Sequence, residues 1–327
     1  MTDKFRLTLA QLNPTVGALE ANAAKARAAW AEGKAAGADM VALPEMFITG
    51  YQTRDLIMKR AFHADATAAL EQLALDCANG PALAIGGPWW DGARLYNAYW
   101  VMERGKVVAR VLKHHLPNDT VFDEVRQFAP ADVGGPYRIG PVRIGSPICE
   151  DAWFDDVTET LAETGAEIIL VPNGSPYYRN KYDRRVGLMV ARVIETKLPL
   201  VYLNLVGGQD DQVFDGGSFV LNPGIELAMQ MPVFDEAVAH VDFERHSGGW
   251  RARRTDVVPL PDEWEQDYHA LVLALRDYMG KSGIGKVLLG LSGGIDSALV
   301  AVIASDALGP QNVRCVMLPS EYTAQHS

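Results

Sequence analysis

Three residues with chemically capable side chains follow apolar runs in this sequence: Glu45, Lys113 and Cys149. Each lies at or just beyond the C-terminal end of a run that predicts a buried strand. The three runs are Met40–Leu43, Val107–Leu112 and Val142–Ile148. Because ligand sites in α/β sheets gather at the carboxyl ends of strands, we expect the three side chains to converge.

A glutamate, a lysine and a cysteine together can hydrolyse a carboxamide. The thiol of Cys149 attacks a carbonyl only as the thiolate, so it needs a proton acceptor, and Glu45 suits that role. Lys113 and a backbone N–H after the cysteine would stabilise the oxyanion. Glu45 would then protonate the departing ammonia and activate water against the thioester. Each residue type alone is more often structural, so the prediction rests on all three.

Two other chemistries compete for the same segment. His114 and His115 stand beside Lys113 and suggest a Cys–His hydrolase, although nothing local orients an imidazole. Mutation of either histidine would test that alternative. A zinc site is not predicted, because the seven histidines are scattered and no Cys or His pair has zinc-ligand spacing.

A glycine-bearing loop near the end of the chain is a second candidate site. It lies between a predicted strand and a predicted helix, where backbone N–H groups and the helix amino terminus favour phosphate. Asp296 would hold Mg²⁺ beside that phosphate. The candidate phosphate-binding residues are Ser292, Gly293, Gly294, Asp296 and Ser297.

Two other interpretations of this region are weaker. Gly290–Gly294 fits the G-x-S-x-G pattern of a serine hydrolase, but only one histidine, His326, follows it. Gly280–Lys286 nearly fits the Walker A pattern, but Val287 replaces the Ser or Thr and the run precedes a strand. A plain glycine turn is the remaining alternative.

Strand-like and helix-like segments alternate around these sites, which predicts a layered α/β fold. Leu19–Ala36 and Val157–Thr164 are expected helices, each followed by a glycine that favours a helix end. Further predicted strands are Leu7–Leu12, Leu83–Gly86, Ile168–Val171 and Leu200–Leu205.

The chain divides into two predicted domains, residues 1–245 and 263–327, joined by a linker at 246–262. The linker is polar and contains Pro259 and Pro261. An amphipathic helix from Trp264 to Tyr278 then opens a β-α-β segment. About 60 residues are too few for a nucleotide-binding domain, so we expect the second domain to be incomplete.

Composition limits the classes of partner. The 327 residues carry a formal net charge of −11, which argues against general nucleic-acid or membrane-surface binding. Three cysteines, Cys77, Cys149 and Cys315, do not form a disulfide framework. The sequence has neither a signal-peptide pattern nor an apolar run of membrane-spanning length. We therefore expect a cytoplasmic enzyme.

The local sequences around the three catalytic candidates resemble those of the nitrilase (carbon–nitrogen hydrolase) superfamily. The resemblance implies an αββα sandwich, a Glu–Lys–Cys triad and a second glutamate, Glu124, that supports the lysine. The matching segments are Leu43–Tyr51, Lys113–Asn118, Val121–Glu124 and Ile148–Trp153.

The glycine-bearing loop resembles the pyrophosphate loop of N-type ATP pyrophosphatases, which implies a partial Rossmann-like domain after the sandwich. Met317–Ser327 looks like the next segment of the NAD synthetases in that group. A nitrilase-type amidase ahead of such a loop is the layout of the glutamine-dependent NAD⁺ synthetase family. Three further segments resemble that family: Pro172–Tyr177, Gly207–Asp210 and Phe214–Phe219.

This family resemblance implies a two-step reaction. Glutamine would be hydrolysed at Cys149, and ammonia would pass through a tunnel to amidate deamido-NAD⁺ with Mg²⁺ and ATP. Glu150, Trp153 and Ser175 are expected to line the glutamine pocket. The resemblance also implies a homo-oligomer, such as an octamer.

Two departures limit the resemblance. Asp119 occupies a place where the family commonly has a tyrosine of the glutamine pocket. The chain also ends before most of a synthetase domain, so we expect it to act alone only as a glutaminase. The alternatives are a stand-alone amidase for another small amide and a catalytically silent assembly or regulatory fragment.

Overall fold

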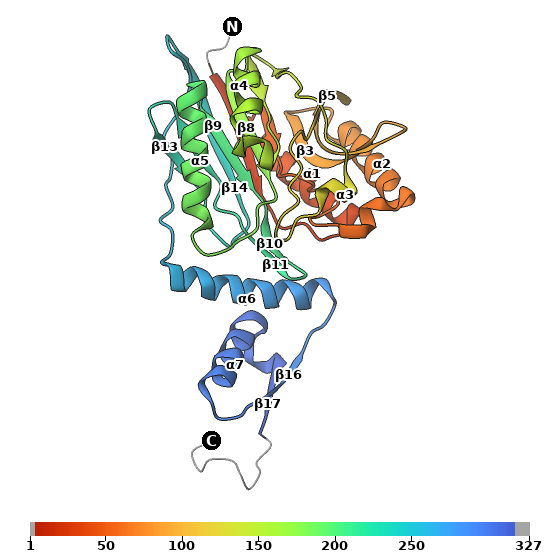
Figure 1. Ribbon diagram of the computed structural model, residues 1–327, viewed down its shortest axis with the longest axis vertical. Helices are drawn as coiled ribbons and strands as arrows, with labels where there is room; N and C mark the ends of the chain where they lie inside the picture. The colour runs from red at the N-terminus through yellow and green to blue at the C-terminus, as the bar shows by residue number, and fades with distance from the viewer. Residues whose placement is uncertain (1–3, 318–327) are drawn as a thin grey trace.

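Two β-sheets stack face to face, and helices cover both outer faces (Figure 1). The computed structural model describes residues 4–317. The buried residues between the sheets come from both of them, with Leu9 and Tyr99 on one side and Leu170 and Val201 on the other. The fold is therefore the predicted αββα sandwich followed by a smaller α/β segment.

The first sheet has seven strands in the order β15-β14-β1-β2-β3-β4-β5. Strands β1, β2 and β3 run parallel, and the remaining neighbours are antiparallel. The bounds are β1 (Lys4–Gln11), β2 (Met40–Ala42), β3 (Ala82–Trp90), β4 (Leu95–Glu103), β5 (Lys106–Leu112), β14 (Ala237–His246) and β15 (Gly249–Ala252).

The second sheet has six strands in the order β13-β12-β9-β8-β7-β6. Strands β7, β8 and β9 are parallel, so their carboxyl ends share one edge. The bounds are β6 (Tyr137–Ile139), β7 (Val142–Gly145), β8 (Ile168–Asn173), β9 (Leu200–Asn204), β12 (Phe219–Asn222) and β13 (Glu226–Gln230).

Helices α1 (Leu19–Ala35) and α2 (Arg60–Asp76) pack on the outer face of the first sheet, and α4 (Asp155–Glu163) and α5 (Lys181–Thr196) pack on that of the second (Figure 1). Leu70 and Leu73 of α2 and Met189 and Val193 of α5 are buried in these outer layers. The short helices are η1 (Arg54–Met58), α3 (Glu124–Gln127) and η2 (Cys149–Trp153).

A long helix, α6 (Glu263–Lys281), lies across one end of the sandwich beneath the hairpin of β10 (Val206–Gln209) and β11 (Gln212–Asp215) (Figure 1). Beyond it, β16 and β17 pair in parallel beside α7. The bounds are β16 (Val287–Gly290), α7 (Ile295–Leu308), η3 (Pro310–Asn312) and β17 (Val313–Val316).

The linker predicted at 246–262 contains part of the first sheet. Strand β14 ends at His246, and Trp250 in β15 is buried in the core between the sheets. The irregular connection to α6 therefore begins only after Ala252. Within residues 4–317, no helix is long and apolar enough to cross a membrane.

Candidate active site

Glu45, Lys113 and Glu124 form a buried charge cluster between the two sheets. The Lys113 Nζ donates to Glu45 Oε1 at 2.7 Å and forms an ion pair with Glu124 Oε2, also at 2.7 Å. The side chains of the lysine and Glu45 are fully buried, and that of Glu124 is 2% exposed. The loop after β2, the end of β5 and the start of α3 position the three residues.

The carboxylate of Glu45 has two further donors, so its orientation is fixed. Asn97 Nδ2 donates to Oε1 at 2.7 Å, and the Gly174 N–H donates to Oε2 at 2.7 Å. A Cβ at Gly174 would lie 2.4 Å from the Tyr51 ring. This position, directly after β8, therefore requires glycine for its N–H to reach the carboxylate.

Glu124 is held by the same network. Tyr51 donates its hydroxyl to Oε1 at 2.8 Å, and Asn97 Nδ2 donates to the same oxygen at 3.0 Å. Burial raises the pKa of Glu124, while Lys113 opposes that shift. Burial also opposes the charge of Lys113, but the two carboxylates raise the pKa of this lysine well above its ordinary value. The lysine is therefore a permanent cation in this site.

Cys149 is the first residue of η2 and is buried, with 4% of its surface exposed. Its φ of 49° is in the left-handed region, which is uncommon for a residue with a side chain and is typical of functional sites. Burial and the charge of Glu45 raise the pKa of the thiol well above its ordinary value, whereas Lys113 lowers it. This shift favours the protonated thiol, whose proton a carboxylate such as that of Glu45 would have to accept.

Asp151 links the segment after Lys113 to the turn that carries the cysteine. Its Oδ1 accepts the N–H groups of His114 and His115 at 3.0 and 2.7 Å, and its Oδ2 accepts that of Ile148 at 3.0 Å. Burial raises the pKa of Asp151 to about 6, although these donors oppose the shift. Near neutral pH, the carboxylate holds the two chain segments together.

The residues expected to line a substrate pocket are Glu150, Trp153 and Ser175. Glu150 is partly buried, and burial raises its pKa while Lys113 lowers it. Trp153 lies under the Lys181 ammonium, with Nζ 4.6 Å from the ring centroid. Ser175 is buried, and its Oγ accepts from Arg185 Nε at 3.2 Å.

Sequence reasoning missed four residues of this centre: Asn97, Tyr51, Lys181 and Arg185. Burial lowers the pKa of Lys181, while the charges of Tyr178 and Cys149 oppose that shift. Tyr51 closes one of the segments that resemble the superfamily, and that position was a usable signal. Asn97 gave no such signal, because the partners of an isolated asparagine in an apolar run cannot be predicted from the local sequence.

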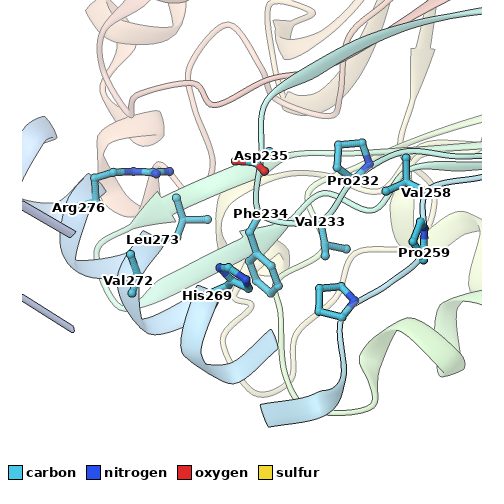
Figure 2. A pocket seen from close by; sticks show the side chains of 11 residues that line it. Pro232, Val233, Phe234, Asp235, Val258, Pro259, His269, Val272, Leu273 and Arg276 are labelled. Atoms are coloured by element: carbon cyan, nitrogen blue, oxygen red, sulfur yellow. The ribbon is translucent and has the colours of Figure 1, made fainter. Parts of the chain in front are cut away.

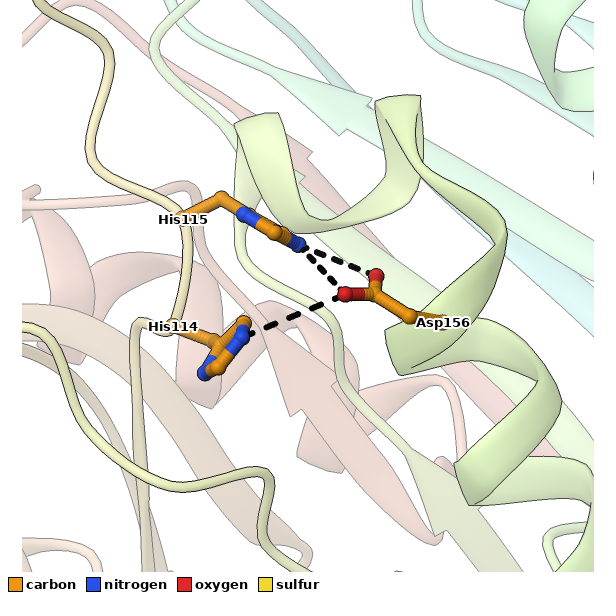
Figure 3. Close-up of side chains that lie close together, drawn as sticks. All are labelled: His114, His115 and Asp156. Carbon is orange, nitrogen blue, oxygen red and sulfur yellow. Dashed lines mark hydrogen bonds and ion pairs between the residues drawn. The ribbon is translucent and has the colours of Figure 1, made fainter.

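The side-chain hydrogen bonds of the two histidines beside Lys113 go to other groups than the cysteine. His115 Nε2 lies 2.9 Å from both carboxylate oxygens of Asp156 (Figure 3). His114 Nδ1 lies 2.6 Å from the Ala131 carbonyl oxygen. Neither imidazole has a hydrogen bond to Cys149 among the described residues. The geometry therefore favours the glutamate as the proton acceptor.

The predicted phosphate loop connects β16 to α7, and its residues Ser292–Asp296 are exposed while Ser297 is partly buried. Ser292 Oγ and Ser297 Oγ are 3.1 Å apart, and Ser297 Oγ donates to the Gly294 carbonyl at 3.0 Å. Gly293 has a φ of 83°, which suits glycine. Asp296 lies in the exposed first turn of α7, beside the N–H groups that phosphate would meet.

At least four cavities among the described residues lie outside the charge cluster. One, of about 290 Å³, separates His269 and Arg276 of α6 from the Pro232–Asp235 segment (Figure 2). Another, of about 400 Å³, is lined by Gln52, Asp123 and other chain neighbours of Tyr51 and Glu124.

Comparison with known sequences decides the family. The profile of the carbon–nitrogen hydrolases matches residues 6–251. The chain belongs to the carbon–nitrogen hydrolase family. A second profile, that of NAD synthase, matches residues 267–327. The hydrolase match covers both sheets and every residue of the buried cluster.

The relatives that match the whole of this chain are longer than it is. The glutamine-dependent NAD(+) synthetase of Rhodobacter capsulatus is 63% identical over 327 residues, which are 100% of this chain and 59% of that protein. That of Acinetobacter baylyi is 37% identical over 99% of this chain and 59% of its own length. The chain thus spans about three fifths of the length of these relatives.

Solved structures agree with the fold. The glutamine-dependent NAD+ synthetase of Acinetobacter baumannii, in complex with ADP, has a TM-score of 0.92 and 34% identity, covering 99% of this chain and 61% of that one. An amidase from Nesterenkonia sp. has a TM-score of 0.65 and 24% identity, covering 73% of this chain and 90% of its own. The amidase supports the hydrolase fold alone.

Proposed function

We propose that this chain carries the glutaminase half of a glutamine-dependent NAD⁺ synthetase, with Cys149 as nucleophile. The single observation that carries the proposal is the buried Glu45–Lys113–Glu124 cluster beside a cysteine in left-handed backbone conformation. Full-chain similarity to glutamine-dependent NAD⁺ synthetases supports glutamine as the amide.

In the proposed reaction, Glu45 takes the thiol proton as Sγ bonds to the amide carbon of glutamine. Lys113 and a backbone N–H after Cys149 stabilise the oxyanion, and Glu124 holds the lysine in place. The C–N bond then breaks, and the protonated Glu45 gives its proton to the departing ammonia. Water, deprotonated by Glu45, releases glutamate from the thioester and restores the thiol.

The substrate pocket follows from the same geometry. Glutamine carries an α-ammonium and an α-carboxylate, so it needs one group of each charge beside the thiol. The partly buried Glu150 supplies a negative charge, and Lys181 supplies a positive one. Trp153 and Ser175 complete the proposed wall. Asp119 lies close enough to raise the pKa of Glu150, so it adds to the negative field at the ammonium end.

For the longer protein, we propose that Mg-ATP activates deamido-NAD⁺ and that ammonia from glutamine amidates it. The loop Ser292–Ser297 offers hydroxyls and helix N–H groups suited to phosphate. Mg²⁺ is commonly held by one or two carboxylates together with substrate phosphates, so Asp296 fits as one ligand. Cytoplasmic location and homo-oligomeric assembly belong to the same proposal.

Ammonia release tests the proposal directly. We expect the chain to release ammonia from glutamine and Cys149→Ala to reduce the rate by at least about 10³-fold, as loss of a catalytic nucleophile does. A panel of small aliphatic amides is the matched comparison. Faster hydrolysis of those amides than of glutamine would indicate a stand-alone amidase. A folded chain without activity on any amide would indicate the silent fragment.

A further inference from the structure

A cluster of two histidines and an aspartate lies on the surface beside the catalytic segments (Figure 3). The ligand atoms of His114, His115 and Asp156 all lie within 4.8 Å of one another. We propose that this His–His–Asp cluster binds a divalent transition-metal ion of the zinc class. No step of glutamine hydrolysis uses these side chains, so the proposal stands independently of the proposed function.

The distances fit such an ion. His115 Nε2 is 2.9 Å and His114 Nε2 is 4.0 Å from Asp156 Oδ2. Zinc bonds of about 2.0–2.1 Å in a tetrahedral site separate neighbouring ligand atoms by about 3.3 Å. The two observed separations bracket that value, so shifts of less than about 1 Å in rotatable side chains would complete the site.

The His114 ring is already oriented as a ligand. Its Nδ1 lies 2.6 Å from the Ala131 carbonyl oxygen, which accepts only from an N–H. The proton of the neutral ring therefore sits on Nδ1, which leaves the lone pair of that form on Nε2. Among the described residues, this Nε2 has no partner within hydrogen-bond distance, and its nearest carboxylate oxygen is that of Asp156 at 4.0 Å. A carbonyl behind a ligating histidine is the usual second contact of metal sites.

The backbone and the exposure of the cluster also suit a metal. Asp151 holds the N–H groups of both histidines, so the two imidazoles start from a fixed backbone. The three side chains are 33%, 26% and 49% exposed, which leaves room for water in the fourth position. Two imidazoles and one carboxylate with an open position form a ligand set known for Zn²⁺.

Metal binding would join two chain segments that carry the catalytic groups. The histidines directly follow Lys113, and Asp156 lies in the first turn of α4, just after the η2 turn of Cys149. Asp151 already connects these segments from inside. A bound ion would add a second connection at the surface and slow amide hydrogen exchange in both.

Cobalt titration of the whole chain, followed by visible absorption and by competition with Zn²⁺, tests the proposal. We expect one equivalent to bind, and His115→Asn and Asp156→Asn each to weaken binding at least tenfold. In Asp156→Asn, the side-chain oxygen can still accept the Val157 N–H that Asp156 Oδ1 accepts at 2.7 Å, so the helix start is retained. His269→Asn is the control, because among the described residues Glu265 is the only carboxylate within 4.0 Å of that exposed imidazole.

Each outcome is decisive. Slower exchange at residues 113–118 and 149–157 on metal addition, lost in both variants, would support the site. Equal affinity in parent and His115→Asn would overturn it, as would a failure of the folded parent to bind at large metal excess. A thiolate-to-cobalt charge-transfer band would also overturn it, by placing the ion on a cysteine.

Discussion

At the scale of single residues, the site buries more negative than positive charge and stabilises the excess with hydrogen-bond donors. Two carboxylates and one ammonium are buried together, which leaves one excess negative charge if all are ionised. Unpaired buried charge is costly, so neutral donors must offset it. Tyr51, Asn97 and the Gly174 N–H provide those donors. Glu45 is thereby kept beside a thiol whose pKa its own charge raises.

The support that Glu124 gives to Lys113 can be measured. In Glu124→Gln the lysine loses one of its two ion pairs, so its Nζ no longer has a fixed position. We expect kcat for glutamine to fall about 10²-fold, the cost of removing one oxyanion donor, with KM nearly unchanged. Steady-state ammonia release would show this, with the exposed Glu159→Gln as control. An unchanged kcat would remove Glu124 from the machinery.

The protonation state of Cys149 gives a second test. Because burial and Glu45 raise its pKa, the thiolate fraction at a given pH is smaller than for a free cysteine, and it keeps growing at higher pH. We expect alkylation of Cys149 by iodoacetamide, followed by peptide mass spectrometry, to accelerate beyond pH 9. A plateau below pH 8 would mean that the cation of Lys113 lowers the pKa overall.

At the scale of elements, the sequence predicted the strands that are buried on both faces, such as β8, and the Ala-rich helix α1. Other elements, such as β4 and α5, were harder to predict because polar residues interrupt their apolar patterns. Asn97 interrupts the apolar run of β4 because it serves two carboxylates. Arg185 interrupts the buried face of α5 because it pairs with Asp215. The partners of both side chains are distant in sequence, so no local pattern contains them.

The Arg185–Asp215 pair connects α5 and β11 to the loop after β8, whose Gly174 N–H donates to Glu45. Arg185 Nη1 lies 2.7 Å from Asp215 Oδ2, and its Nη2 donates to the Ser175 carbonyl at 2.7 Å. Asp215→Ala would leave a buried guanidinium without its counter-charge, so we expect a loss of about 3–5 kcal/mol in urea unfolding. The exposed Asp183→Ala on α5 is the control. A loss equal to that of the control would contradict this account.

At the scale of the whole molecule, α6 joins the sandwich to the segment with the phosphate loop. Asp277 Oδ2 accepts Asn13 Nδ2 at 2.6 Å and the Gly208 N–H at 2.7 Å. Lys281 Nζ donates to Asn13 Oδ1 and to the Gly208 carbonyl, each at 2.7 Å. The amphipathic pattern predicted this helix, but it could not predict a polar junction with residues more than 60 positions away.

The junction should be sensitive to one substitution. Asp277→Ala leaves two donors without an acceptor, at about 1–3 kcal/mol each, so we expect faster amide hydrogen exchange in α6 and in the β10–β11 hairpin. Exchange in α1 serves as the internal control. Unchanged exchange in α6 would show that its apolar contacts, such as Leu273 with Phe234, suffice to hold it.

The most direct test of the central claim is the intact mass of the chain after exposure to an electrophilic glutamine analogue. We predict one adduct on the parent, located at Cys149 by peptide mapping, and none on Cys149→Ala. That result would establish a glutamine-selective thiol in the buried cluster. No adduct on the folded parent, or an equal adduct on the variant, would contradict glutamine hydrolysis at this cysteine.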